Sequence, residues 1–591
     1  MAKHQHRIIL KMKMKSWHFL LFVAALLSYC YAETVPCDLR ETVYGSVCVC
    51  NSTYCDYLVN PLPSWPRDFT IISSTKAGLR FASSSGEFGT EKKHIINDHG
   101  FKTRVSPTEF LTPQDEAEFE PISLVIDQRG PAFMELALSA SSGKSFFDLT
   151  SMRDQLARNV RVNINRNIKY QTIVGFGGAF TGAVSHVLQQ VERPLQDQVY
   201  RSYFGEDGIG FSILRMTIGG CDFDLEPWAY NEQPHDDAKL SNFTQLDVRD
   251  MLKVQQLQRL KEVAELDNIK IMAAAWSPPT WMKSNNRWTG FSHLKPEFYQ
   301  AWADYHLRFL ELMDAKNTPI WAISTGNEPL NGVIGWFFVH FMSLGWTPQN
   351  QATWLSEHLG PTIKNSNFKN VLIFGNDDQR YTFPSWFKVM NISSPNSLDY
   401  LDGLAVHWYW DDIFGPSLID AAHKAMPNKL LLNTESCIGD KPWQKHGPKL
   451  GSWERGEKYM NAFMQDLQHS FNGWIDWNVV LDENGGPSYA DNFVDAPVIM
   501  NVTNRQEFYK QPIFYAIGHF SKFIPEGSVR IDVQVSNIVI DVVAFRRPDE
   551  RIVAVVFNSG RAPVDVALND SVRGNIVINI PARSMHTIVY N

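Results

Sequence analysis

The sequence lacks any run of 18 or more apolar residues, which is the length that a membrane-spanning helix needs. Its 17 histidines are scattered without the spacing of a metal site, and no glycine-rich phosphate-binding motif opens a predicted helix. Acidic residues outnumber basic ones, 63 to 55, and an acidic chain is a poor partner for nucleic acid. We therefore expect a chain without a membrane span, metal ion, cofactor or bound nucleic acid.

Acidic residues are absent from the first 32 positions, which hold five basic ones. The basic start precedes a short apolar segment, Trp17–Ser28, and the small residues Cys30 and Ala32 follow it. This pattern is typical of a cleaved secretory signal peptide, residues 1–32. A signal anchor is the alternative, although the apolar segment is too short to cross a bilayer. Loss of the five cations would move the formal net charge from −8 to −13.

Three of the 17 histidines lie in the predicted signal peptide, so the other fourteen would remain in the mature chain. Their protonation, together with that of carboxylates, reduces the negative charge near pH 5. Such a surface approaches an anionic membrane only in an acidic compartment. We therefore expect peripheral membrane contact at acidic pH.

Cysteine is also scarce, with seven in the whole chain. Four of them crowd together directly after the predicted cleavage site, which in a secreted chain favours a small disulfide-stapled sheet over residues 33–58. The spacing leaves three pairings open, and a zinc site is the alternative. Each of two later cysteines sits beside a candidate site carboxylate, and we expect both to be free, buried thiols. The clustered cysteines are Cys37, Cys48, Cys50 and Cys55, and the later ones are Cys221 and Cys437.

Five Asn-x-Ser/Thr motifs fit passage of the chain through an oxidising, glycosylating route. Any single motif of this kind is used in some proteins and unused in others. The five begin at Asn51, Asn242, Asn391, Asn501 and Asn569.

From residue 169 onward, eight short apolar runs alternate with longer amphipathic stretches. Eight strands alternating with helices predict an α/β fold, a (β/α)8 TIM barrel, built from residues 169–481 and 509–526. A doubly wound sheet is the alternative, and the missing phosphate-binding motif argues against it. The eight runs are Ile173–Gly178, Phe211–Thr217, Ile269–Ala275, Ile320–Ser324, Val371–Phe374, Leu404–Val406, Leu430–Asn433 and Trp474–Val479.

The two chain ends have a different texture, with short strands bounded by Gly, Pro, Asn and Asp. Residues 60–168 and 527–591 therefore predict one all-β sandwich built from both ends, with an insertion of unassigned role within 88–158. Residues from about 482 to 508 are expected to complete the small sheet. The predicted strands near the C-terminus are Ile531–Val535, Ile538–Val542, Ile552–Phe557 and Ile576–Ile580.

Two of the predicted barrel strands end in a single glutamate, Glu328 in a Gly-Asn-Glu-Pro turn and Glu435 three strands later. A parallel barrel gathers the carboxyl ends of its strands on one rim, and paired carboxylates on one rim are typical of glycosidases. A retaining glycosidase needs one of the pair protonated and the other ionised. Other strand ends add amides, carboxylates and large aromatics, which suit the hydroxyls and C–H face of a sugar. Those include Asp222, Trp276, Asn327, His407, Tyr409 and Trp477.

The chain resembles the glucosylceramidases of glycoside hydrolase family 30, which are lysosomal acid β-glucosidases. The resemblance covers the cysteine cluster and nearly all of residues 169–530. Its most specific segments are Val47–Cys55, Gly175–Ala179, Ser277–Lys283, Ala405–Tyr409 and Gly518–Ser528.

The resemblance implies a retaining enzyme that cleaves glucosylceramide to glucose and ceramide, with Glu328 as acid/base and Glu435 as nucleophile. It also implies the disulfides Cys37–Cys48 and Cys50–Cys55, a lysosomal location, and activation by a saposin-type protein with anionic lipid. Secretion is the alternative location. The residues implied to hold the glucosyl unit are Asp222, Trp276, Asn327, Trp477 and Asn492, with His407 and Tyr409 lining the site.

Two other functions stay open at this point. A related family 30 enzyme could cleave a glucan or a xylan, and a protein that only binds glycans or lipids would not need both glutamates. Gly326 departs from the family pattern before Asn327, and we expect it to loosen the turn that carries Glu328.

Overall fold

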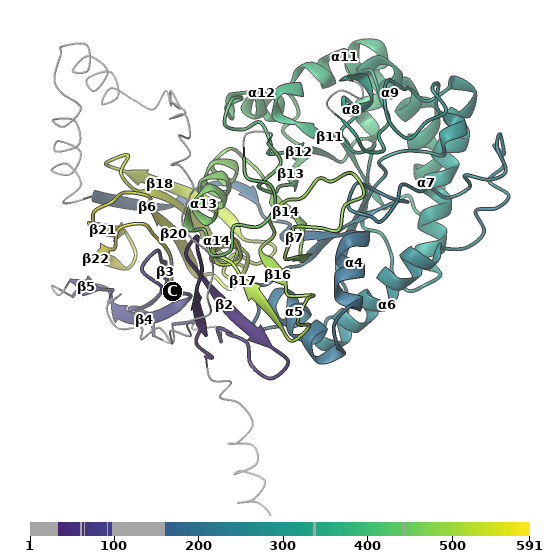
Figure 1. The fold of residues 1–591 in the computed structure, drawn as a ribbon. Coiled ribbons are helices and arrows are strands. Elements are labelled where there is room, and N and C mark those ends of the chain that lie inside the picture. The colour runs from purple at the N-terminus through teal and green to yellow at the C-terminus, as the bar shows by residue number, and fades with distance from the viewer. Residues whose placement is uncertain are drawn as a thin grey trace, which may run out of the picture.

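The computed structural model describes residues 34–59, 62–63, 65–90, 93–96, 160–334, 339–441 and 444–591. The predicted signal peptide and most of the predicted insertion lie outside the described residues. Figure 1 shows a barrel beside a β-rich body in which strands from both chain ends, purple and yellow, lie together.

The predicted (β/α)8 barrel is confirmed: eight strands close on themselves in the order β10-β11-β12-β13-β14-β7-β8-β9. All neighbouring strands run parallel, and each predicted apolar run supplies one strand. Buried side chains from seven of the strands fill its interior, among them Met272, Phe374 and Ile475. The strands are β7 (Gly175–Phe180), β8 (Ile213–Thr217), β9 (Lys270–Ala274), β10 (Ala322–Ser324), β11 (Leu372–Gln379), β12 (Gly403–His407), β13 (Leu430–Glu435) and β14 (Gly473–Asn478).

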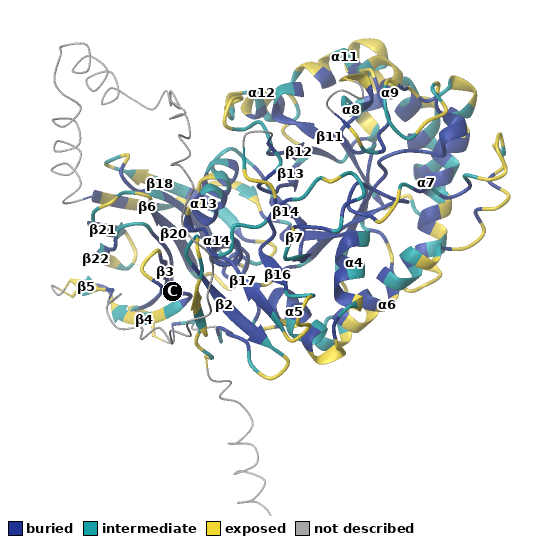
Figure 2. Ribbon diagram, in the orientation of Figure 1, coloured by how far each residue is buried: buried dark blue, intermediate teal, exposed yellow. Residues whose placement is uncertain are grey.

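Helices surround the barrel, and most of them have a buried inner face and an exposed outer face, whereas the barrel strands are almost entirely buried (Figure 2). The helix α14 is buried along its whole length. They are α4 (Gly182–Gln189), α5 (Arg193–Phe204), α6 (Val248–Val263), α7 (Tyr299–Asp314), α8 (Asn331–Ile334), α9 (Pro348–Trp354), α10 (Gly360–Lys364), α11 (Ser385–Ser393), α12 (Ser417–Ala425), α13 (Trp453–Gln468) and α14 (Pro512–Ser521). Short 3-10 or π turns are η1 (Thr280–Met282), η2 (Pro296–Phe298), η3 (Leu355–Leu359), η4 (Arg380–Thr382) and η5 (Pro395–Tyr400). None of the described helices is both long enough and apolar enough to cross a membrane.

A five-stranded sheet joins the cysteine cluster to a distant part of the chain, in the order β1-β2-β17-β16-β15. Its strands are β1 (Leu39–Glu41), β2 (Ser46–Asn51), β15 (Leu481–Asp482), β16 (Val498–Met500) and β17 (Glu507–Lys510). The structure contains the disulfides Cys37–Cys48 and Cys50–Cys55, which are the pairs that the family resemblance implies.

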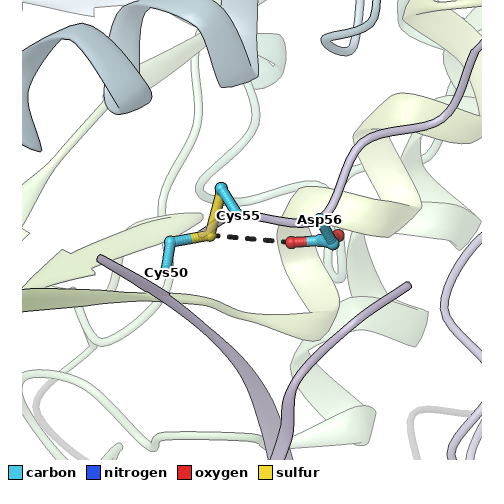
Figure 3. A group of neighbouring side chains, drawn as sticks. All are labelled: Cys50, Cys55 and Asp56. Atoms are coloured by element: carbon cyan, nitrogen blue, oxygen red, sulfur yellow. Dashed lines mark hydrogen bonds between the residues drawn. A yellow bond between two sulfur atoms is a disulfide. The ribbon is translucent and has the colours of Figure 1, made fainter. Parts of the chain in front are cut away.

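The zinc alternative for this cluster fails. Cys50, Cys55 and Asp56 come together (Figure 3), but the two sulfurs are bonded to each other and offer no thiolate. The Asp56 carboxylate is instead engaged by Lys510 Nζ at 3.2 Å and by the Tyr515 hydroxyl at 2.6 Å. Asp56 therefore ties the small sheet to α14.

A ten-stranded sheet contains strands from both chain ends, in the order β4-β3-β23-β20-β19-β18-β6-β21-β22-β5. Two details differ from expectation. Residues 169–172 belong to β6 and not to the barrel, and Ile538 to Ile540 form a turn with Ile538 exposed, so that strand begins at Asp541. The strands are β3 (Asp68–Thr75), β4 (Ala82–Glu87), β5 (His94–Ile95), β6 (Val160–Thr172), β18 (Val529–Val535), β19 (Asp541–Arg546), β20 (Ile552–Asn558), β21 (Val564–Asp570), β22 (Gly574–Ile580) and β23 (Ser584–Tyr590).

Two fully buried histidines lie where α14 of the barrel meets β23 of this sheet. His519 contacts Ser74 and Thr587 hydroxyls, each at 2.9 Å, and His586 contacts Ser73 at 2.9 Å and Ser584 at 2.7 Å. Burial lowers the pKa of His586 to about 3, and burial with the neighbouring His586 holds the pKa of His519 well below its usual value. Both rings therefore stay neutral in mild acid.

These histidines should make the contact between α14 and β23 sensitive to acid. Between about pH 6.5 and pH 3 the unfolded chain binds a proton on His586 that the folded chain does not, so stability falls as pH falls. The wild type should lose unfolding free energy when the pH is lowered from 6.5 to 4.5. In His586→Gln this loss should be smaller by about 2–3 kcal/mol, measured by urea unfolding at the two pH values. The exposed His235→Gln is the control and should leave that loss unchanged. Equal losses in wild type and His586→Gln would contradict the argument.

Candidate active site

The turn after β10 presents Glu328 at the carboxyl end of the barrel. Gly326 adopts φ +120°, a conformation that side chains rarely adopt, so glycine suits this turn. The expected loosening is offset by two backbone bonds of 2.9 Å, from Asn327 N–H to the Ala275 carbonyl and from Glu328 N–H to the Asp377 carbonyl. Glu328 itself has φ +43°, which is strained for a residue with a side chain.

Glu435 is the last residue of β13, and its side chain is buried by the surrounding strand ends. One carboxylate oxygen accepts the Tyr409 hydroxyl at 2.7 Å, and the other accepts Arg215 Nη1. The Tyr409 oxygen also lies 3.5 Å from the Cys437 sulfur. Cys221 and Cys437 are both free and buried, as the sequence predicts.

Arg215, in the middle of β8, is the central cation of this site and is 0% exposed. Besides Glu435, its guanidinium donates through Nη2 to Asn327 Oδ1 at 2.7 Å and to Asp377 Oδ2 at 2.9 Å. It therefore joins the ends of three other strands. A single cation in an otherwise apolar strand was the signal in the sequence, because a buried arginine requires buried anions.

His407, at the end of β12, bridges two carboxylates. Its Nδ1 lies 3.0 Å from Glu328 Oε1, and its Nε2 lies 3.1 Å from Asp377 Oδ1. Glu328 also accepts Gln379 Nε2 at 2.7 Å and the side-chain amide of Asn331. The two glutamates are thus linked through one chain of contacts that passes by way of His407, Asp377 and Arg215.

The end of β11 supplies three residues that the sequence reasoning missed: Asp377, Asp378 and Gln379. A register shift against β12, with positive φ at Asn376 (72°) and Asp377 (56°), turns consecutive side chains toward the rim instead of alternating them. The polar run after Val371–Phe374 was the available signal, because it follows an apolar strand as the other site residues do.

The predicted sugar-binding residues surround the two glutamates. Asn492 Nδ2 donates to Asp222 Oδ2 at 2.8 Å. The Trp276 and Trp477 rings stack, with centroids 5.4 Å apart at 25°, and the Arg215 guanidinium lies over both. Carboxylate, amide and aromatic faces, the groups that bind sugars, therefore meet at this rim.

The network sets the protonation of its members. Although burial opposes it, the charges of Glu435 and Asp377, with hydrogen bonds to Asp377 and Glu328, raise the pKa of His407 to about 10. Against the effect of burial, Arg215 and His407 hold the pKa of Asp377 well below its usual value. Burial raises the pKa of Glu435 despite the opposing charges of His407 and Arg215, whereas the hydrogen bond and charge of His407 outweigh burial and lower the pKa of Glu328. Burial and the charge of Glu435 raise the pKa of Asp222 to about 7.

Glu328, His407 and Glu435 also lie close enough to share a metal ion. Their ligand atoms are already engaged by hydrogen-bond donors, and the guanidinium of Arg215 occupies the place of a counter-cation. This donor set suits the hydrogen-bonded network better than a metal ion.

Substitution of Arg215 should lower the free energy of unfolding, because the buried carboxylates lose a cationic partner. Arg215→Met leaves Asp377 and Glu435 buried without the guanidinium, although His407 remains beside Asp377, and we expect a loss of about 3–5 kcal/mol of unfolding free energy. Combining Arg215→Met with Asp377→Asn also removes one of the buried negative charges. Urea unfolding should therefore show the double variant to be more stable than Arg215→Met alone. The half-exposed pair of Arg308 and Glu311 gives the control Arg308→Met, with a loss below about 1 kcal/mol. Equal losses for Arg215→Met and Arg308→Met would refute the assignment.

Comparisons with known proteins agree with this arrangement. Residues 173–524 match the glycosyl hydrolase family 30 TIM-barrel domain, and residues 527–588 match the family 30 beta sandwich domain. The chain is 36% identical over 579 residues to the lysosomal acid glucosylceramidase of Mus musculus, which covers 97% of this chain and 98% of that relative.

Solved structures agree on the fold. SrfJ from Salmonella typhimurium has a TM-score of 0.70 at 20% identity, covering 89% of this chain and 99% of its own. The endo-β1,6-glucanase BT3312 has a TM-score of 0.65 at 23% identity, covering 73% and 94%. Likeness at such identity shows the fold alone. From the match across the barrel and the closeness of the mouse relative, the chain belongs to glycoside hydrolase family 30.

Proposed function

We propose that this glycoside hydrolase cleaves the β-glucosidic bond of glucosylceramide with retention, releasing glucose and ceramide. The observation that carries the proposal is the approach of Glu328 and Glu435, whose carboxylate oxygens lie within 4.8 Å of each other. Retaining glycosidases hold their carboxyl groups about 5–5.5 Å apart, and inverting ones about 6.5–9.5 Å apart. An approach this close between one oxygen of each carboxylate supports direct attack by a carboxylate, as in a retaining enzyme.

The reaction proceeds in two displacements. Glu435 attacks the anomeric carbon, the bond to the ceramide oxygen breaks, and Glu328 gives its proton to that oxygen as ceramide leaves. Glu328 then takes a proton from water, the water oxygen attacks the anomeric carbon, and the bond to Glu435 breaks to release glucose. The contacts of Arg215 and Tyr409 with Glu435 support its role as the ionised attacking group.

Glu328 needs a proton although its own pKa is lowered. His407, whose Nδ1 lies 3.0 Å from Glu328 Oε1, orients the carboxyl but is not the source of this proton, because its raised pKa means that it binds a proton more tightly than Glu328 does. In acid, solvent supplies the proton that Glu328 gives to the leaving oxygen.

The surrounding residues fit a glucosyl unit. Asp222 and Asn492 would take sugar hydroxyls, Trp276 and Trp477 would stack on its C–H face, and the Asn327 amide would hold the 2-hydroxyl. The last contact strengthens in the transition state of glycosidases.

Exposed apolar side chains on the same rim favour a lipid over a soluble glucan. They follow the carboxyl ends of four barrel strands, where a ceramide chain or a lipid surface would meet the site. These side chains, with their exposed fractions, are Leu225 (62%), Phe291 (60%), Val333 (42%), Ile334 (42%), Ile413 (65%) and Phe414 (36%).

We further propose a lysosomal location, with secretion as the alternative, and activation by a saposin-type protein and anionic lipid at acidic pH. The name of the mouse relative supports the location. The five glycosylation motifs are compatible with the same route, because none of their asparagines is buried and Asn242 and Asn391 are exposed.

Substitution of the two glutamates tests the chemistry. Glu435→Gln should lower kcat/KM for glucosylceramide and for aryl β-glucosides at pH 5 by about 10³-fold or more, because no nucleophile remains. Glu328→Gln should spare the first step with 2,4-dinitrophenyl β-glucoside, whose leaving group needs no proton, and slow glucosylceramide. Wild-type activity on soluble glucans or xylan but not on glucosylceramide would overturn the substrate assignment, and full activity of Glu435→Gln would overturn the mechanism.

Rim substitutions test the lipid assignment. Leu225→Ser, Phe291→Ser and Ile413→Ser combined should weaken binding to anionic liposomes at pH 5 by about 10²-fold or more, since full burial of each side chain contributes up to about 2 kcal/mol. Hydrolysis of a soluble aryl glucoside should be unchanged. Ile538→Ser is the control, because Ile538 is 71% exposed and lies in the β18–β19 turn of the ten-stranded sheet, not after a barrel strand. Liposome binding that neither depends on the rim nor strengthens on acidification would exclude this surface.

A further inference from the structure

Asp378, at the end of β11, is a buried carboxylate that the proposed mechanism leaves without a role. Asp378 is only 1% exposed. Oδ2 accepts the Leu330 N–H at 3.1 Å, and Oδ1 accepts the Gln379 N–H at 2.6 Å. Among the described residues it forms no ion pair with a lysine, arginine or histidine.

Its neighbour Asp377, in the same strand, is a carboxylate that does have cationic partners. Asp377 is paired with Arg215 and His407 and accepts the Thr434 hydroxyl at 2.7 Å. Asp378 has only neutral backbone donors. A buried carboxylate without a cation is costly, and such groups persist where they tune a neighbour.

The two donors of Asp378 flank Glu328. Leu330 lies two residues beyond Glu328 in the same turn, and the Gln379 side chain donates to Glu328 Oε1. Asp378 therefore fixes the backbone of the turn that carries Glu328, through Leu330, and the backbone of Gln379, whose side chain donates to Glu328.

Three donors act on Glu328: His407, Gln379 and Asn331. All three favour the ionised form, whereas an acid must hold a proton. The titratable groups facing Asp378 are Glu328 in the β10 turn, His407 on β12 and Tyr381 in η4. The negative charge of Asp378 opposes the three donors.

We propose that Asp378 is a positioning residue: it fixes the turn that carries Glu328 and the Gln379 donor, and its buried negative charge favours the protonated form of Glu328, the form that acts as the acid. This inference rests on the proposed function of Glu328. In agreement with it, burial and the charge of Glu328 raise the pKa of Asp378 to about 7. The pair thus retains a proton well above the pH at which an isolated carboxyl loses it.

Asp378→Asn tests the proposal through the pH dependence of kcat/KM. For octyl β-glucoside, whose leaving oxygen needs a proton, the alkaline limb should move to lower pH by about one unit or more. This shift gives a loss of about tenfold at pH 6.5. For 2,4-dinitrophenyl β-glucoside, kcat/KM should change less than about threefold over the same range. Asp378→Ser removes the same charge with a smaller side chain and should shift the limb in the same direction.

Two further variants separate charge from structure. Thr382→Val breaks the 2.6 Å bond from Asn376 Nδ2 in the same segment, so it should lower the urea midpoint and leave the pH profile in place. Gln379→Met removes a donor to Glu328, so its alkaline limb should move to higher pH.

The outcomes distinguish this inference from the proposed function. If the wild type cleaves neither glucoside, the proposed function fails. If it cleaves both, and Asp378→Asn keeps the wild-type profile or loses activity equally on both substrates, Asp378 has only a structural role and this inference fails. Should neither Asp378 variant fold, the wild type decides: an alkaline limb below about pH 5, where isolated carboxyls titrate, would also overturn the inference.

Discussion

The buried guanidinium of Arg215 is the interaction on which the candidate active site depends. One cation reaches the turn after β10, the end of β11 and the end of β13 from its place in β8. Charges taken out of water at such a depth are tolerated only when opposite charges and hydrogen bonds replace the lost solvent. The closed barrel makes this replacement geometrically possible, because it brings the carboxyl ends of distant strands to one rim.

The rim concentrates strain as well as charge. Asn376, Asp377 and Glu328 all adopt positive φ, and the register of β11 shifts at the same place. Residues in such conformations cost free energy and persist when the surroundings hold them. Here the Glu328 N–H to Asp377 carbonyl bond joins the two strained segments directly. This bond is one of several contacts that hold Glu328 in place, together with the donors His407, Gln379 and Asn331.

The sequence predicted the barrel because alternation of apolar runs with helices is a local pattern, and each of the eight runs became a strand. It also predicted that Glu328, Glu435, Asp222 and Trp276 would meet, since strand ends converge in a parallel barrel. It missed Arg215 and the Asp377–Gln379 segment, because their roles depend on contacts across the barrel and on a register shift that no local pattern encodes. The assignment of Ile538 to Ile540 to a strand was wrong because the local pattern misled it. These residues are apolar and β-branched, as in a strand, but they form the turn between β18 and β19.

Mild acid leaves the charges of one part of this molecule unchanged and destabilises another part. In the active site, the lowered pKa of Asp377 and the raised pKa of His407 preserve the ionic network down to low pH, since neither group changes charge in mild acid. At the joint of barrel and sandwich, His519 and His586 must remain neutral, so the folded state loses stability as pH falls below the ordinary histidine range. The two disulfides of the small sheet contain no titratable group, so mild acid does not change the constraint that they place on the chain. The small sheet is therefore held by two bonds that mild acid does not weaken, whereas the contact between α14 and β23 loses stability in acid.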